Sequence, residues 1–231
     1  MWYKFKKKFI ADKDFYRHVL FLAVPMIIQN AITSFVSFLD NIMVGQIGTE
    51  QMSGVAIVNQ LMFVFNICIW GGTSGASIFS TQYYGKGDFE GQKYCFRFKC
   101  YVMALLSVIA CVLFNFQGTN LISLYLSDSG SIGDIGLALK YGEQYLAIMI
   151  FGLIPFAITN AYVSTIRETG QTFIPMLASA VAVGTNLVLD LALIFGIGPI
   201  PAMGVQGAAL ATVIARVMET MTVVVGSHTH M

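Results

Sequence analysis

Six long apolar stretches constrain this chain more than any other feature of its sequence. A helix needs about 20 mostly apolar residues to cross the hydrocarbon core of a bilayer. The stretches that meet this length run roughly over residues 19–44, 52–77, 98–116, 145–166, 173–195 and 205–225. We therefore predict an all-α, polytopic membrane protein. The simplest architecture is one compact bundle of six transmembrane helices.

Charged residues are scarce, which agrees with a chain that lies mostly in lipid. Only 11% of the 231 residues are charged and 56% are hydrophobic, and the mean hydropathy is +0.72. A soluble domain carries about 25% charged residues. The net charge of +1 gives no reason to expect a nucleic-acid partner. The expected surroundings are therefore the lipid bilayer.

Lysine and arginine are distributed unevenly between the two sides of the predicted bundle. With six crossings, one side holds Lys4, Lys6, Lys7, Lys8, Lys13, Arg17, Lys86, Lys93, Arg97, Lys99 and Arg167. The loops of the other side hold only Lys140. Because cytoplasmic loops are enriched in Lys and Arg, we expect a multi-pass protein of the cell membrane with both termini cytoplasmic.

The predicted helices divide the chain into three parts. Residues 1–18 form a cytoplasmic N-terminal segment, residues 19–225 form the six-helix bundle, and residues 226–231 begin a linker. The connections are short except for residues 117–142, which are rich in Gly and Ser and are predicted as a long loop with room for a short surface helix.

An acid within an apolar helix is the strongest functional signal. Asp190 lies in such a run with Asn186 one turn before it, so both side chains share one helix face. An ionisable residue in the membrane is a functional candidate by default because it is costly to keep. At 1.5 Å per residue, Asp190 lies about 7–8 Å and Asn186 about 13 Å below the outer end of their helix.

Two residues of other helices reach a similar depth. Asp40 lies about 6 Å below the outer end of the first helix and Thr212 about 10 Å below that of the sixth. The oxygens of Asp40, Asn186, Asp190 and Thr212 suit Na⁺, or a proton shared between the acids. Alternatives remain for three of them: Asp40 as a solvated helix-end acid, and Asn186 and Thr212 as helix-packing residues.

Several motifs extend this pattern along most of the chain. Residues 39–45 read LDNIMVG, residues 82–88 read QYYGKGD, residues 166–172 read IRETGQT, and residues 207–212 read GAALAT. In this order and spacing they resemble the multidrug and toxic compound extrusion transporters, called MATE. The resemblance covers about residues 15–221.

The resemblance implies an efflux antiporter that exports organic, often cationic, compounds in exchange for Na⁺ or H⁺. It implies no enzyme activity and no cofactor beyond the coupling ion. The cation site of the family's N-terminal lobe falls on the four residues selected by depth, with supporting hydrogen bonds from Tyr145 and Asn160. Such transporters have two lobes and twelve helices, so this chain is expected to be one lobe. Its partner is then a missing C-terminal lobe or a second copy.

Other polar residues in the helices have two interpretations. Gln29, Asn30, Gln60 and Asn66 either line a cavity for a drug-like substrate or hold helices together. As a mechanism, we expect cation binding at Asp40 and Asp190 to change the packing of the first helix near Pro25 and to favour drug release. Cation and drug are coupled only if each binds two states of the lobe differently.

Two other functions match single features of the sequence. A flippase for lipid-linked or polysaccharide precursors shares the wider fold, but it needs basic residues to meet a pyrophosphate. Arg216 is the only such residue expected within a helix, and snorkelling to the interface or pairing with Glu219 explains it better. An intramembrane aspartyl protease is the more remote alternative. Residues 85–88 read GKGD, which matches its GxGD pattern, but Asp88 falls in a basic loop.

Overall fold

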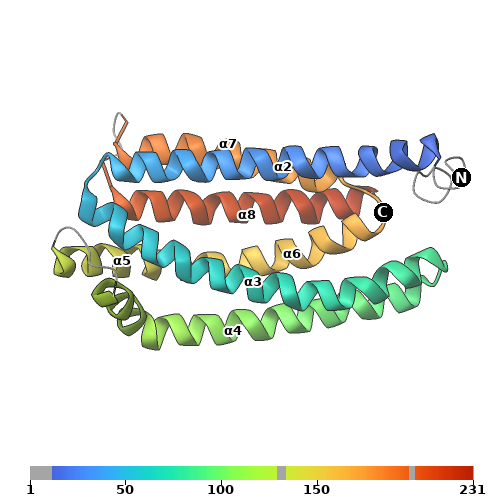
Figure 1. Cartoon of the computed structure of the whole chain (residues 1–231), viewed down its shortest axis with the longest axis horizontal. Coiled ribbons are helices and arrows are strands. Elements are labelled where there is room, and N and C mark those ends of the chain that lie inside the picture. Colours follow the sequence, from blue (N-terminus) through green and yellow to red (C-terminus); the bar gives the residue numbers. More distant parts are fainter. Residues whose placement is uncertain (1–11, 129–133, 198–200, 231) are drawn as a thin grey trace, which may run out of the picture.

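The computed structural model describes residues 12–128, 134–197 and 201–230, and these residues form an antiparallel bundle of long helices (Figure 1). The helices in chain order are α2 (Lys13–Gly45), α3 (Thr49–Gly85), α4 (Phe89–Asp128), α5 (Ile135–Met149), the 3₁₀ turn η1 (Ile150–Gly152), α6 (Leu153–Glu168), α7 (Phe173–Ile194) and α8 (Val205–His230). α5, η1 and α6 follow one another without a break.

Six helical segments of the described chain are long and apolar enough to cross a membrane, with Ile135–Glu168 counted as one. They correspond to the six stretches predicted from the sequence, and the all-α fold is confirmed. Many apolar side chains on these helices are exposed, including Phe21, Trp70, Tyr101 and Phe116. Such a surface is expected where lipid surrounds the bundle.

Both described chain ends lie at one end of the bundle, here called the terminal end (Figure 1). The turns after α3 and α6 lie there too, and both are closed by a glycine at positive φ, Gly87 at 73° and Gly170 at 80°. Glycine adopts this conformation without steric cost and ends a helix. The other end, here called the opposite end, holds the turns that join α2 to α3 and α7 to α8.

The predicted long loop over residues 117–142 is wrong for most of its length. α4 continues to Asp128 and α5 begins at Ile135. Gly118 lies where a side chain would meet Leu146 of α5, because a Cβ atom there would be 2.6 Å from a Leu146 methyl group. The glycine that suggested a loop instead permits close packing of two helices.

The predicted ends of the bundle are also helical. α2 begins at Lys13, within the segment expected to precede the membrane, and α8 continues to His230, through the segment expected to begin a linker. A helix can continue from the membrane into water, so the helical ends do not decide where the membrane begins. The boundaries at residues 18 and 225 stay predictions. Residues 1–11 and 231 lie outside the described chain.

Candidate cation site

Two acids from neighbouring helices lie close together near the opposite end of the bundle. α2 and α7 run side by side (Figure 1). Asp40 is on the last turns of α2 and is half-buried, whereas Asp190 is on the last turns of α7 and is 0% exposed. Their carboxyl groups are near enough to interact electrostatically. The fold therefore pairs two acids that are distant in the sequence.

Three oxygens of this acid pair are buried without a hydrogen-bond partner among the described residues. They are Oδ1 of Asp40 and both Oδ1 and Oδ2 of Asp190. Buried polar atoms normally have partners, because leaving them unpaired is costly. An unpaired set of carboxylate oxygens fits a bound cation or bound protons.

Tyr145 of α5 lies beside the two acids. Its side chain is 1% exposed, its hydroxyl donates to Oδ1 of Asn59 at 3.4 Å, and it interacts with Asp40, Asp190 and the Thr212 side chain. Asn59 on α3 was not predicted as a site residue. The only signal in the sequence was its place in the apolar helix that also carries Gln60.

The close crossing of α3 and α5 explains why Asn59 and Tyr145 meet. A Cβ atom on Gly54 would lie 2.5 Å from the backbone oxygen of Ala138 and 2.7 Å from the backbone nitrogen of Gly142. Only glycine permits this approach of two backbones. Asn59 comes five residues after Gly54 and Tyr145 three residues after Gly142, so both lie about one turn beyond the crossing and meet there.

A second close crossing positions Thr212. A Cβ atom on Gly207 would lie 2.6 Å from the backbone oxygen of Leu193, and Met203 N donates to the same oxygen at 2.8 Å. These contacts hold the start of α8 against the end of α7. Thr212 therefore lies at the level of Asp190.

The two remaining predicted residues are less closely tied to the acids. Asn186 is half-buried one turn before Asp190, and no hydrogen bond within the described chain joins it to the cluster. Asn160 donates from Nδ2 to the backbone oxygen of Phe156 at 2.8 Å, so its amide is used within its own helix. The structure thus gathers Asp40, Asp190, Tyr145 and Thr212, here called the acid cluster.

The residue types of the acid cluster indicate which kind of cation it can bind. No group of three His, Cys, Asp or Glu side chains gathers anywhere in residues 12–128, 134–197 and 201–230. Two carboxylates accompanied by neutral oxygens suit a monovalent hard cation or protons better than a transition metal, which prefers nitrogen or sulfur ligands.

The residues considered for a substrate cavity lie in different environments. Gln29 is buried and hydrogen-bonded, Asn30 and Gln60 are exposed, and Asn66 is half-buried with an unpaired Oδ1. None of them lines any of three cavities found in the described part of the chain, of about 430, 450 and 510 Å³, which lie between α7 and α8, α4 and α6, and α3 and α4. Their role in a substrate cavity stays a prediction.

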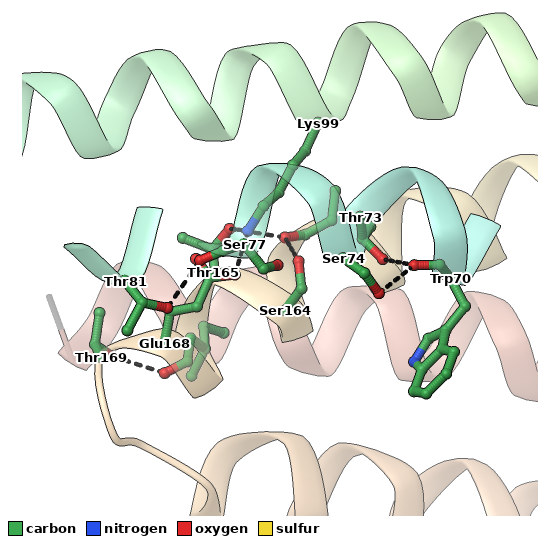
Figure 2. Close-up of polar contacts among 12 residues, drawn as sticks. Trp70, Thr73, Ser74, Ser77, Thr81, Lys99, Ser164, Thr165, Glu168 and Thr169 are labelled. Atoms are coloured by element: carbon green, nitrogen blue, oxygen red, sulfur yellow. Dashed lines mark hydrogen bonds and ion pairs between the residues drawn. The ribbon is translucent and has the colours of Figure 1, made fainter. Parts of the chain in front are cut away.

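Lys99 is buried inside the bundle, which its predicted place among the basic residues of one side does not indicate. It lies within α4 and its side chain is 0% exposed. Its Nζ atom is 2.5 Å from Oε1 of Glu168 and donates to Oγ1 of Thr165 at 3.3 Å. Figure 2 shows Lys99 reaching from α4 to these two residues of α6.

The observations behind the two alternative functions have structural explanations. Arg216 does not snorkel: its guanidinium lies inside the lobe, 5.0 Å from the centre of the Phe156 ring, and donates to the Gly152 oxygen at 3.4 Å. Asp88 accepts from the Gly91 backbone at 2.9 Å and so caps α4 at the terminal end. Asp40 lies near the opposite end of the bundle, away from Asp88.

The fold and the acid cluster define a multi-pass membrane protein with a buried candidate cation site. The chain belongs to the MatE family, whose model matches residues 25–192. A probable multidrug resistance protein NorM of Thermotoga maritima is 26% identical over 200 residues, covering 87% of this chain and 42% of the relative. A FAD transporter of Shewanella oneidensis is 28% identical over 204 residues, covering 85% and 42%.

Solved structures show the same fold. The outward-facing conformation of a multidrug resistance MATE family transporter of the MOP superfamily superposes with a TM-score of 0.72 at 24% identity, covering 89% of this chain and 43% of that one. The chain thus spans less than half the length of the relatives it matches. The predicted family, and the prediction that the chain corresponds to an N-terminal lobe, are confirmed.

Proposed function

We propose that this lobe binds the coupling cation of an exporter of small organic compounds. The observation that carries the proposal is the pairing of Asp40 and Asp190, with three buried oxygens that lack partners among the described residues. A cation or protons would satisfy these oxygens and neutralise the pair. The coupling ion is Na⁺ or H⁺, and no further cofactor is needed.

The names of two relatives support the proposed substrate class. The related protein of Thermotoga maritima is named a probable multidrug resistance protein and that of Shewanella oneidensis a FAD transporter. Both names describe small organic cargo. We therefore assign drug-like organic compounds to this chain as substrates, in exchange for the cation.

The mechanism joins the cation to a change in helix packing. α2 carries both Asp40 and Pro25, and proline removes one backbone hydrogen bond and bends a helix. Neutralising the acid pair removes the repulsion between α2 and α7, so cation binding favours one arrangement of α2. The cation drives export only if drug affinity differs between the arrangements. Conversion into transport requires a second lobe, because such transporters move one lobe against the other.

The orientation in the membrane follows the basic residues. Lys13, Arg17, Lys86, Lys93 and Arg97 lie toward the terminal end, whereas Lys140 lies toward the opposite end. The terminal end is accordingly cytoplasmic and the acid cluster faces the outside. An external Na⁺ or H⁺ would then reach the acid pair from the side of higher concentration.

Cation-dependent stabilisation of the purified chain tests the proposal. A ligand that binds only the folded state raises its stability. In lipid nanodiscs, the unfolding temperature should rise with NaCl but not with choline chloride at equal ionic strength, or should rise on mild acidification. Asp190→Asn and Asp40→Asn should remove the response, and Glu90→Gln, which changes an exposed acid at the terminal end, should keep it. A normal response in Asp190→Asn would refute the site.

A further inference from the structure

A groove opens between α3 and α4 near the terminal end, far from the acid cluster, where the two helices run side by side (Figure 1). Four aromatic side chains line it, Phe79 and Tyr83 of α3 and Tyr94 and Phe98 of α4, and all four are exposed. The volume of this aromatic groove, about 510 Å³, is in the range of ligand sites in proteins.

Two glycines give the aromatic groove its shape. A Cβ atom on Gly91 of α4 would overlap the ring of Tyr83, so glycine at this position lets the ring lie against α4. A Cβ atom on Gly75 of α3, which also lines the groove, would meet nothing within 4 Å. Gly91 therefore positions one wall of the groove, and Gly75 leaves its deeper end open.

The tyrosines lie nearer the terminal end than the phenylalanines. Tyr83 lies against Gly91, and a Cβ atom on Gly72 would lie 2.9 Å from Cγ1 of Val102. Because α3 and α4 are antiparallel, these two contacts fix which residues of the two helices lie at the same level. From the terminal end inward, the order of the rings is Tyr83, Tyr94, Phe79 and Phe98.

The aromatic groove crosses the level at which the apolar stretches end. The stretches predicted to cross the membrane cover residues 52–77 on α3 and residues 98–116 on α4. Tyr94 lies one turn before Phe98, about 6 Å nearer the terminal end. The headgroup region adds about 5–7 Å to each side of the hydrocarbon core. Tyr94 therefore lies at the level of phospholipid headgroups, and Phe98 lies where the acyl chains begin.

Arg97 brings a positive charge to the headgroup level. Its guanidinium carbon lies 5.6 Å from the centre of the Tyr94 ring, so the side chain runs back along α4 toward the terminal end. Among the described residues Arg97 forms no ion pair, whereas Lys93 on the same helix is paired with Glu90. The donors of a guanidinium match the oxygens of a phosphate. Arg97 is therefore suited to bind an anionic headgroup at the edge of the groove.

We propose that the aromatic groove binds one phospholipid with an anionic headgroup. Arg97 binds its phosphate at the level of Tyr94, and the glycerol and the first part of the acyl chains lie along Phe79 and Phe98. A lipid fits because it presents charge, ester groups and hydrocarbon in the order in which the groove presents guanidinium, tyrosine and phenylalanine. In the proposed orientation, the groove faces the cytoplasmic leaflet, which contains anionic lipids. The binding itself does not depend on the export function.

Native mass spectrometry of the purified chain in a nonionic detergent measures this binding directly. Dioleoylphosphatidylglycerol, which is anionic, should bind with a lower Kd than dioleoylphosphatidylcholine, which has no net charge. Arg97→Gln should raise the Kd for the anionic lipid about fivefold or more, the effect of one basic residue at an anionic membrane surface. Arg17→Gln is the matched control, because it removes the same charge from an exposed residue of α2 toward the same end. It should bind like the wild type.

A second pair of variants tests the groove without changing a charge. Gly75→Leu places a side chain in the open end of the groove and should weaken binding of the anionic lipid. Gly71→Leu is its control, because Gly71 lies one turn away on the same face of α3, has nothing within 4 Å of its Cβ position and does not line the groove. This pair also serves if Arg97→Gln does not fold.

Three outcomes would overturn the inference. Equal affinity of the wild type for the two lipids would remove the anionic headgroup, and equal losses in Arg97→Gln and Arg17→Gln would indicate general attraction to a basic surface. A wild-type dimer that dissociates in Gly75→Leu would assign the groove to a second copy of the chain. Asp190→Asn should lose the cation-dependent stabilisation and keep the lipid binding, so failure of the cation site and failure of the lipid site are distinguishable.

Discussion

Lys99 of α4 and Glu168 of α6 form an ion pair inside the bundle, with 2.5 Å between Nζ and Oε1 and only 0% and 7% of their side chains exposed. The pair joins two helices that the chain connects only through α5 and η1. In low-dielectric surroundings, each partner depends on the other, because an isolated buried charge is far more costly than a paired one.

Lys99→Met should destabilise the lobe strongly. The change leaves Glu168 as an unpaired buried charge, for which the expected loss is about 3–5 kcal/mol. The double variant Lys99→Met with Glu168→Leu should recover most of this loss, since no charge remains. Lys93→Met is the matched control, because Lys93 pairs with Glu90 on the surface at 62% and 70% exposure, and such pairs contribute about 1 kcal/mol or less.

Thermal unfolding of the purified variants in one detergent measures these differences. Equal unfolding temperatures for Lys99→Met and Lys93→Met would contradict a structural role of the buried pair. A double variant as unstable as Lys99→Met would show that side-chain packing, and not the unpaired charge, causes the loss.

Gly54→Ala should disturb the crossing of α3 and α5. The new Cβ atom would lie 2.5 Å from a backbone oxygen, which neither helix can accommodate without moving. Overpacking of this kind costs about 1–3 kcal/mol. Gly71→Ala on the same helix is the control, because its Cβ atom would meet nothing within 4 Å, and replacing a helical Gly by Ala stabilises by up to about 1 kcal/mol. The two variants should therefore shift the unfolding temperature in opposite directions.

Features fixed by local sequence were predictable, because they depend only on residues near one another in the chain. Length and apolar composition identify six crossings, and the rise per residue places Asp40, Asp190 and Thr212 at a common depth. The structure then brings Asp40 and Asp190 together through the packing of α2 on α7. Depth along each helix was therefore enough to find the acids.

Features that depend on helix rotation and on contacts between distant residues were not predictable. The burial of Lys99 depends on its pairing with Glu168, which is far away in the sequence. Asn59 is a neighbour of Tyr145 only through the crossing at Gly54. Gly118 suggested a loop, since a glycine that permits helix packing cannot be told from one that ends a helix without knowing its neighbour.

The orientation of the lobe is tested by accessibility at the two ends. Lys86→Cys lies in the exposed turn after α3 at the terminal end, and Gln46→Cys lies in the exposed turn after α2 at the opposite end. In intact cells, a membrane-impermeant maleimide should label Gln46→Cys and should label Lys86→Cys only after the membrane is broken. The unsubstituted chain reports the background from the native cysteines, and the reverse pattern would invert the proposed topology.

The two neutral residues predicted as cation ligands, Asn186 and Thr212, distinguish Na⁺ from a proton. A sodium ion needs several oxygen ligands, whereas a proton needs only a carboxylate. Asn186→Leu combined with Thr212→Val should weaken the sodium-dependent stabilisation about tenfold or more in concentration, a typical loss for a disturbed metal site. The response to acid should remain, because Asp40 and Asp190 are unchanged. If both responses survive in the double variant, Asn186 and Thr212 pack helices and are not cation ligands; if both disappear together, the substitutions have disturbed the acid pair itself.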